Sequence, residues 1–239
     1  MTSSAPQIGF DRFIHLDWVT VALKARAGTG SLEEVKAVLE AAGLGVEARK
    51  KTRTVLNRLW LEPRQELAEF ADRGAAIFQE DPAFPASALT WGMAIATYPF
   101  FGKVAELVGR LTALQGDCAS SEVHRRMSEV YGEREGTYRM TNMVLQSQSN
   151  WGALERVEKG KRLVRLAPVV LTNDDAVAWL IEGAVRFLGK AVSVGSLQSL
   201  PVLYPFVLDR PIAYLISQTS TLDLRSEGGT NQLVRLRSS

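Results

Sequence analysis

Two stretches near the middle of the chain gather the side chains that could do chemistry. In the first, residues 137–149, helical spacing puts five polar side chains on one face: Tyr138, Arg139, Asn142, Gln146 and Ser149. Arg, Asn and Gln side chains can hydrogen-bond to base edges, and Arg and Ser can contact phosphates. No acid falls between residues 137 and 149, in a chain with 26 Asp and Glu residues. The pattern predicts a recognition helix that contacts DNA.

The second stretch is a basic turn between two short strands, expected at residues 154–157 and 163–166. Residues 156–165 hold five basic side chains and one acid, and the turn itself reads Glu158-Lys-Gly-Lys161. A basic hairpin beside a polar helix can straddle a groove and its phosphates. We expect the phosphate contacts from Lys159, Lys161, Arg162 and Arg165, with Arg125 and Arg126 added from the preceding helix.

The elements that must position these side chains follow one another in a recognisable order. First comes a helix at residues 104–115, and then a helix capped by Ser120 or Ser121. A turn with Gly132 and Gly136 leads into the polar helix, and the hairpin at residues 151–166 follows it. That order predicts a winged helix-turn-helix. Its expected core positions are Val104, Leu107, Val108, Leu111, Leu114, Val123, Met127, Val130, Met140, Met143, Val144, Ser147 and Trp151.

The rest of the chain favours a mainly α fold around this unit. We expect a disordered leader at residues 1–9, a helical bundle at 10–102, the winged-helix unit at 103–171, and C-terminal helices with a β hairpin at 172–239. Helical spacing starts at Phe10, Ser31 and Glu34 form a capping box, and Leu32 faces inward. Residues 99–102 are expected to form a hinge. The run Thr172-Asn-Asp-Asp175 supplies an N-cap and an acidic first turn for a later helix. Alternating side chains at residues 221–225 and 232–236, on either side of a Gly-Gly turn at 226–229, predict the terminal hairpin.

The composition excludes several classes of function. A net charge of +2 across 239 residues gives no general attraction to nucleic acid, so local clusters must supply it. The single cysteine, Cys118, and two histidines, His15 and His124, cannot build a structural zinc site or a disulfide. His15 is expected to be a hydrogen-bonded structural histidine, and His124 to be exposed. No phosphate-binding loop or nucleophile elbow occurs, so we expect no enzyme, cofactor or metal.

Hydropathy and the first residues suggest where such a protein works. The most apolar run, residues 88–101, is too short to span a bilayer. The first residues lack the charged and apolar regions of a signal peptide. These patterns predict a soluble cytoplasmic protein that does not bind a membrane.

A second basic face is expected on the helix at residues 46–61. Its cations are Arg49, Lys50, Lys51, Arg53 and Arg58. Such a face is commonly a solvated helix surface. The alternative is that it follows phosphates and extends a DNA footprint. Both interpretations stay open.

Two runs of the sequence resemble a known family. The runs are Glu47–Leu59, and Ser121–Tyr131 leading through Asn142–Leu145 to Trp151–Leu154. They are similar to the small helical BrxA-like accessory proteins of BREX phage-defence systems, over about residues 30–170. The resemblance implies a non-enzymatic component that acts with larger DNA-modifying or ATPase partners.

Two functions therefore compete. The first is a non-catalytic accessory protein that binds double-stranded DNA. The second is a protein–protein adaptor in a multi-subunit complex, without direct DNA contact. The adaptor would dock its partner through the polar helix or through the apolar segment 192–206, with Leu200, Leu203, Tyr204 and Phe206.

Overall fold

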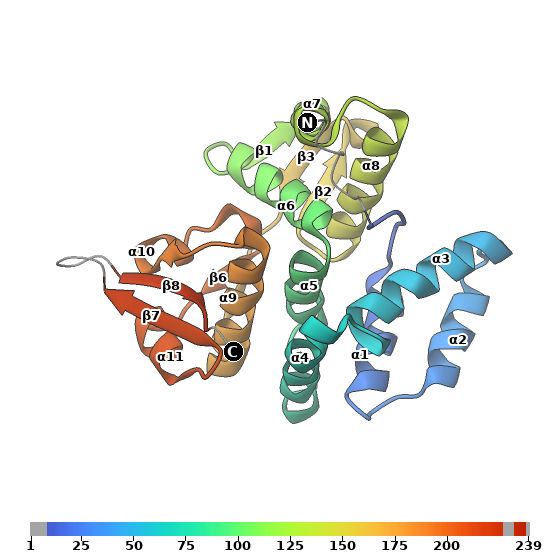
Figure 1. Cartoon of the computed structure of the whole chain (residues 1–239). Coiled ribbons are helices and arrows are strands. Elements are labelled where there is room, and N and C mark those ends of the chain that lie inside the picture. Colours follow the sequence, from blue (N-terminus) through green and yellow to red (C-terminus); the bar gives the residue numbers. More distant parts are fainter. Residues whose placement is uncertain (1–8, 227–231, 238–239) are drawn as a thin grey trace, which may run out of the picture.

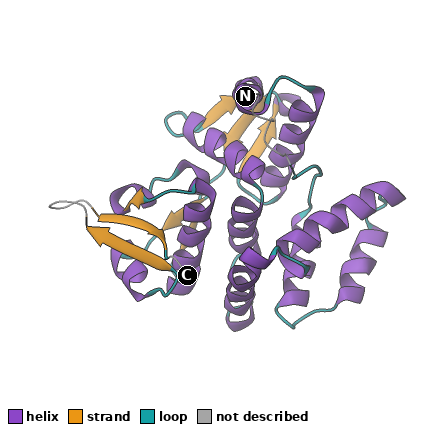
Figure 2. Ribbon diagram, viewed as in Figure 1, coloured by secondary structure: helices purple, strands orange, loops and turns teal. Residues whose placement is uncertain are grey.

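The computed structural model describes residues 9–226 and 232–237. This part of the chain is mainly helical, with three small sheets (Figure 2). The expected leader, apart from Gly9, and the terminal turn after Ser226 lie outside the described residues. Figure 1 shows α5 standing between the N-terminal helices, the sheet-bearing middle of the chain and the C-terminal part.

The N-terminal helices largely follow their sequence signals. They are α1 (Leu16–Arg26), α2 (Leu32–Ala41), α3 (Val46–Leu56), which continues as a π-helical stretch (Asn57–Leu61), and α4 (Ala68–Glu80), which follows a 3-10 turn (Gln65–Leu67). The capping box of Ser31 and Glu34 is confirmed. Leu32 is 54% exposed, so its inward placement was wrong; it occupies the first helical position, where the chain still faces solvent.

The first helix begins six residues later than its spacing predicts, and the cause is a set of contacts from a distant helix. The Ile14 amide donates to Ser147 Oγ at 2.9 Å, and the Leu16 amide donates to Asn150 Oδ1 at 2.7 Å. The Trp151 indole N–H donates to the Ile14 carbonyl at 2.9 Å. These bonds hold the segment before Leu16 extended. His15 then caps α1, its Nδ1 accepting from the Asp17 amide, as a structural histidine.

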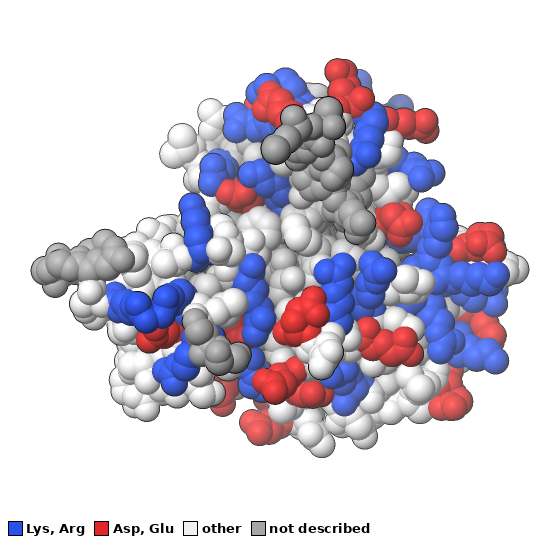
Figure 3. All heavy atoms as spheres, in the orientation of Figure 1, with Lys and Arg blue, Asp and Glu red and all other residues white. Residues whose placement is uncertain are grey.

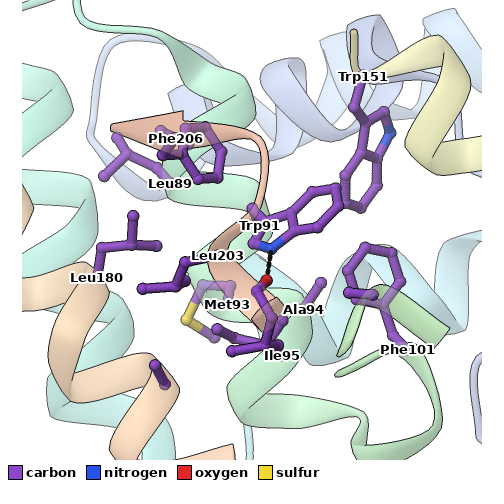
Figure 4. Packing of buried hydrophobic residues seen from close by; sticks show 14 of the residues in the cluster. Leu89, Trp91, Met93, Ala94, Ile95, Phe101, Trp151, Leu180, Leu203 and Phe206 are labelled. Carbon is purple, nitrogen blue, oxygen red and sulfur yellow. Dashed lines mark hydrogen bonds between the residues drawn. The ribbon is translucent and has the colours of Figure 1, made fainter. Parts of the chain in front are cut away.

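Helix α5 (Ala86–Thr97) is buried on nearly every side, as its small apolar residues predict. Trp91 donates its indole N–H to the Val202 carbonyl at 2.9 Å and meets Phe101 and Trp151 edge-on (Figure 4). Helix α9 (Asp174–Leu188) lies along α5, and its N-cap is Asn173, which belongs to the expected capping run at residues 172–175. The contact between these two helices centres on Trp179.

Trp179 of α9 lies where two glycines remove side chains from the helices that face it. A methyl group at Gly92 of α5 would overlap the indole, and one at Gly74 of α4 would lie 2.7 Å from its Cζ2. The indole stacks on Phe70 with a centroid distance of 4.3 Å and donates to the Phe70 carbonyl at 2.8 Å. One face of the indole and its polar atom are thus occupied by Phe70, and the glycines leave room for the rest of the ring.

The middle of the chain, residues 99–165, is called the central unit below. It contains α6 (Pro99–Leu111), β1 (Asp117–Ala119), α7 (Ser120–Tyr131), α8 (Glu135–Asn150), β2 (Leu154–Val157), a 3-10 turn (Glu158–Gly160) and β3 (Arg162–Arg165). The strands form an antiparallel sheet in the order β1-β3-β2. In Figure 1, α6, α7 and α8 surround this sheet.

Three expectations for the central unit were wrong. Residues 99–102 are the first turn of α6 instead of a hinge, because proline fits the first helical position. That helix ends at Leu111, before the turn at Gly116, and Leu114 is therefore 98% exposed. Val130 is 45% exposed, since the buried face of α7 runs through Val123, His124, Met127 and Tyr131.

The C-terminal part contains two further small sheets. Strand β4 (Val169–Leu171) pairs in parallel with β6 (Phe206–Leu208). Strand β5 (Val192–Ser193), β8 (Gln232–Leu236) and β7 (Leu222–Ser226) form the other sheet, which includes the expected antiparallel hairpin. This part also contains α10 (Val194–Leu197), a 3-10 turn (Pro201–Leu203) and α11 (Ile212–Gln218).

A buried carboxylate joins this hairpin to the helices. Glu182 of α9 is 1% exposed and accepts from Arg73 of α4 at 2.7 and 2.8 Å. It also accepts from Arg186 at 2.9 Å and from the Thr221 hydroxyl, just before β7, at 2.7 Å. Burial by itself raises the pKa of this carboxyl, but the bonds from Arg73, Thr221 and Arg186 outweigh it and leave the pKa below its usual value.

We expect the Gly92→Ala substitution to lower the free energy of unfolding by about 2–3 kcal/mol, because the added methyl overlaps Trp179 in a filled core. Gly136→Ala in α8 is the matched control, since its methyl would meet nothing within 4 Å. It should leave stability unchanged or raise it by up to about 1 kcal/mol. Urea unfolding followed by circular dichroism measures both. Equal stability of the two variants would contradict the tight fit at Trp179.

We expect Glu182→Gln to destabilise the protein by about 3 kcal/mol at pH 7, because it leaves Arg73 and Arg186 without their carboxylate. The folded-state pKa of Glu182 lies below its ordinary value of 4.5, so its contribution is present above about pH 4.5 and disappears as the pH falls through the folded-state pKa. The gap between wild type and variant in urea unfolding should therefore narrow in acid. The exposed Glu40→Gln serves as control. A gap that is independent of pH would be the contrary result.

Candidate nucleic-acid interface

The polar face of α8 is partly exposed. Tyr138 and Arg139 are exposed, whereas Asn142, Gln146 and Ser149 are half-buried. The helix begins at Glu135, two residues before the expected start, so an acid lies in its first turn and the acid-free description was wrong. A carboxylate is favourable there, because the first turn of a helix carries partial positive charge. Met143 is only half-buried, and the core side instead includes Thr141, Leu145 and Gln148.

The basic turn presents two lysines to solvent. Glu158 and Lys159 have positive φ angles of 52° and 57°, and Gly160 follows at 83°. This left-handed turn points Lys159 and Lys161 outward, and both are exposed. Within the described residues neither lysine forms an ion pair, and the same is true of Arg139. These three side chains keep their charge available for a ligand.

The other predicted phosphate-binding cations are engaged inside the molecule. Arg125 pairs with Glu122 at 2.7 Å and with Glu129, and Arg126 pairs with Glu122 at 2.7 Å. Hydrogen bonds from both arginines lower the pKa of Glu122 to about 2. The structure therefore places Arg125 and Arg126 on the surface of α7 with most of their charge balanced by acids of the same helix.

The two arginines of β3 are engaged as well. Arg162 Nε donates to Asp117 Oδ2 across the sheet at 2.9 Å, and its guanidinium lies 3.7 Å from Glu158. Arg165 is half-buried, donates to the Tyr204 carbonyl and lies 5.6 Å from the centroid of the Tyr204 ring. Arg165 therefore ties the central unit to the C-terminal part.

A cluster that the sequence did not reveal lies behind Tyr138. The His124 ring stacks on Tyr138 with a centroid distance of 4.0 Å and an interplanar angle of 21°. His124 is 8% exposed, so its expected exposure was wrong: α7 turns this ring toward α8. Below it, Arg156 of β2 donates to Asn142 Oδ1 at 3.3 Å. The sequence shows Arg156 as part of the basic run at residues 156–165. It does not show the burial of His124, which depends on how α7 packs against α8.

Burial governs the charge of this cluster. It lowers the pKa of His124, and the nearby Arg156 lowers it further, while Asn142 acts in the opposite direction. Burial also lowers the pKa of Arg156. His124 Nδ1 and Arg156 Nε are buried and have no hydrogen-bond partner among the described residues. The His124 imidazole is therefore neutral near pH 7, and its buried Nδ1 has no hydrogen-bond partner among the described residues.

Tyr138, His124 and the basic turn line one hollow of about 1020 Å³. The hollow brings together the start of α8, the outer side of α7, β1 and the turn, with lining side chains that include Asp117, Cys118, Ser121, Arg125, Ser128, Glu129, Glu133, Glu158, Lys161 and Arg162. Arg139, Asn142 and Gln146 are not part of its lining. The Cys118 thiol has its pKa raised to about 11 by burial, Asp117 and Glu122, so it stays protonated and is a poor nucleophile.

The second basic face lies on α3, away from this hollow. Arg49 donates to the Leu44 carbonyl and Lys50 pairs with Glu47 at 3.1 Å. Lys51 and Arg53 are exposed and have no ion pair within the described residues. In Figure 3, Lys and Arg side chains gather over the α3 region, whereas both charges alternate over the central unit. The structure keeps this face separate from α8 and the basic turn.

Within residues 9–226 and 232–237, no group of three or more His, Cys, Asp or Glu side chains could hold a metal ion. No helix in the same part is long and apolar enough to cross a bilayer. Comparisons with protein-family models, with curated proteins and with solved structures find no match to this chain.

We expect the imidazole of His124 to titrate below pH 6.5, because burial and Arg156 both disfavour its charged form. Replacing Arg156 with Gln removes one of these causes and should move the pKa of His124 upward. The measurement is a pH titration of the ring signals by NMR, with a His15→Gln variant to assign the two histidines. A pKa of His124 at or above 6.5 in the wild type would contradict the buried, stacked position.

Proposed function

We propose that the central unit is a winged helix-turn-helix and that the protein binds double-stranded DNA without catalysing a reaction. The order helix, strand, helix, helix and two-stranded hairpin supports this proposal. So does the short connection between α7 and α8, where Gly132 has a φ of 85°. In this arrangement α8 enters a major groove, and the turn at Lys159 and Lys161 lies over the neighbouring phosphates.

The observation that carries the proposal is the trio of exposed cations without ion pairs among the described residues: Arg139, Lys159 and Lys161. A cation already paired with a carboxylate releases few counterions when it meets a phosphate. Arg125, Arg126 and Arg162 are paired in this way, so we assign them a minor share of the affinity. Asn142 and Gln146 are half-buried and could contact bases only after small side-chain movements.

The biological setting is also a proposal. The resemblance of residues 30–170 to BrxA-like accessory proteins favours a component of a phage-defence system. Such a component would act beside larger DNA-modifying or ATPase partners.

The alternative is a protein adaptor. Its support is the balanced surface of α7, where Glu122 and Glu129 neutralise the arginines, because protein interfaces tolerate such mixed charge better than DNA does. The route through residues 192–206 is closed in this conformation: Leu203, Tyr204 and Phe206 are 3%, 3% and 6% exposed. An adaptor would therefore have to use the exposed face of α8.

We expect the triple substitution of Arg139, Lys159 and Lys161 by Ala to weaken binding to duplexes of any sequence by at least tenfold at about 0.1 M salt. The slope of log affinity against log salt should become shallower by about 0.9 for each phosphate that the variant no longer neutralises. Fluorescence anisotropy with a labelled random duplex measures both quantities.

Two variants complete this experiment. Replacing the exposed cations Lys24, Arg64 and Lys190 by Ala removes equal charge from other surfaces, and should change neither the affinity nor the salt slope appreciably. Replacing Lys51 and Arg53 by Ala tests the α3 face. Unchanged affinity and slope in the central-unit triple variant would contradict the proposal, and absence of duplex binding by the wild type at low salt would favour the adaptor.

A further inference from the structure

Tyr138 forms an aromatic platform at the edge of the hollow. One face of its ring is covered by the His124 imidazole, nearly parallel to it at 4.0 Å. The residue is nevertheless 57% exposed and contributes to the lining of the hollow. A phenol ring that is held from behind and open in front presents a fixed flat surface, which suits a second planar ring.

The platform is backed by polar atoms that lack partners. His124 is 8% exposed and lines the hollow, and its Nδ1 has no hydrogen-bond partner within the described residues. Arg156 Nε, beside Asn142, also has no partner within the described residues, but Arg156 does not line the hollow. Buried polar atoms are nearly always satisfied in native proteins, so an unsatisfied one in a hollow points to a group supplied from outside.

The charges of the lining decide which part of a ligand enters. Asp117, Glu129 and Glu158 are each paired with an arginine, and Glu133 adds an exposed acid. Four acids thus accompany Arg125, Lys161 and Arg162, so the interior gives no net attraction for phosphate. An uncharged planar group fits there, while the phosphates attached to it remain near Lys159 and Lys161.

We propose that the hollow takes an unpaired nucleotide of a DNA strand, with its base stacked on the open face of Tyr138, whose other face His124 supports. The base must be unpaired, because a base inside a duplex is covered on both faces by its neighbours. This inference rests on the proposed DNA binding and adds a preference to it. The protein recognises a duplex that carries a single-stranded tail or an extruded base.

The test compares two DNAs with the same duplex: one blunt and one with a three-nucleotide tail that carries 2-aminopurine. The wild type should bind the tailed DNA about tenfold more tightly, and 2-aminopurine fluorescence should be quenched. Tyr138→Ala should remove the quenching and bring the ratio of tailed to blunt affinity down to about one. Tyr138→Phe keeps the ring and should behave as the wild type. Thermal melts check that both variants are folded.

The outcomes separate this inference from the proposed function. Equal wild-type affinity for tailed and blunt DNA overturns the inference and leaves duplex binding intact. Absence of binding to either DNA contradicts both. Release of the tail by free deoxyadenosine monophosphate, at concentrations equal to those of the tailed DNA, would show a site for free nucleotides and overturn the assignment to a DNA strand.

Discussion

The fit of Trp179 against two glycines is the constraint on which the rest of the molecule depends. Gly92 of α5 and Gly74 of α4 allow the indole to lie against both helices. Gly183 lets α9 approach α5 closely, since a methyl group there would lie only 3.1 Å from the Gly92 carbonyl oxygen. Helix α5 also contacts α1 and α6, so its position is transmitted to both ends of the chain. A side chain at Gly92 would separate α9 from α5. Trp91, on the same helix, donates to the Val202 carbonyl and contacts Trp151 of the central unit, so the position of α5 also affects these parts.

The polar contacts reinforce the same arrangement. Glu182 joins α4, α9 and the start of the hairpin through three donors, and burial makes each of those bonds stronger than it would be in water. At the other side, Ser147 and Asn150 of α8 bind the extended segment before α1. Arg165 reaches the Tyr204 carbonyl from β3. The central unit is therefore held by both neighbours, so its exposed face rests on a fixed support.

Elements with local signals could be predicted from the sequence. The capping box at Ser31 and the N-cap within residues 172–175 depend on neighbouring residues, and each lies where expected. Features decided by distant contacts could not be predicted: the extended segment at Ile14 depends on Ser147, and the burial of Tyr204 depends on Trp91. In the candidate site, the pairing of Glu122 with Arg126 follows helical spacing, but the pairing of Arg162 with Asp117 requires the sheet register.

Internal ion pairs change how the basic composition of the central unit must be interpreted. Its arginines on α7 and β3 satisfy acids or carbonyls of the same chain, so that among the cations predicted to contact DNA only Arg139 and two lysines are exposed and have no ion pair within the described residues. Three cations give weak and strongly salt-dependent affinity for DNA. A binding protein with so few of them gains most from a contact that does not depend on charge. An aromatic ring held by a neutral histidine is such a contact, and the structure has one in Tyr138, beside the basic turn.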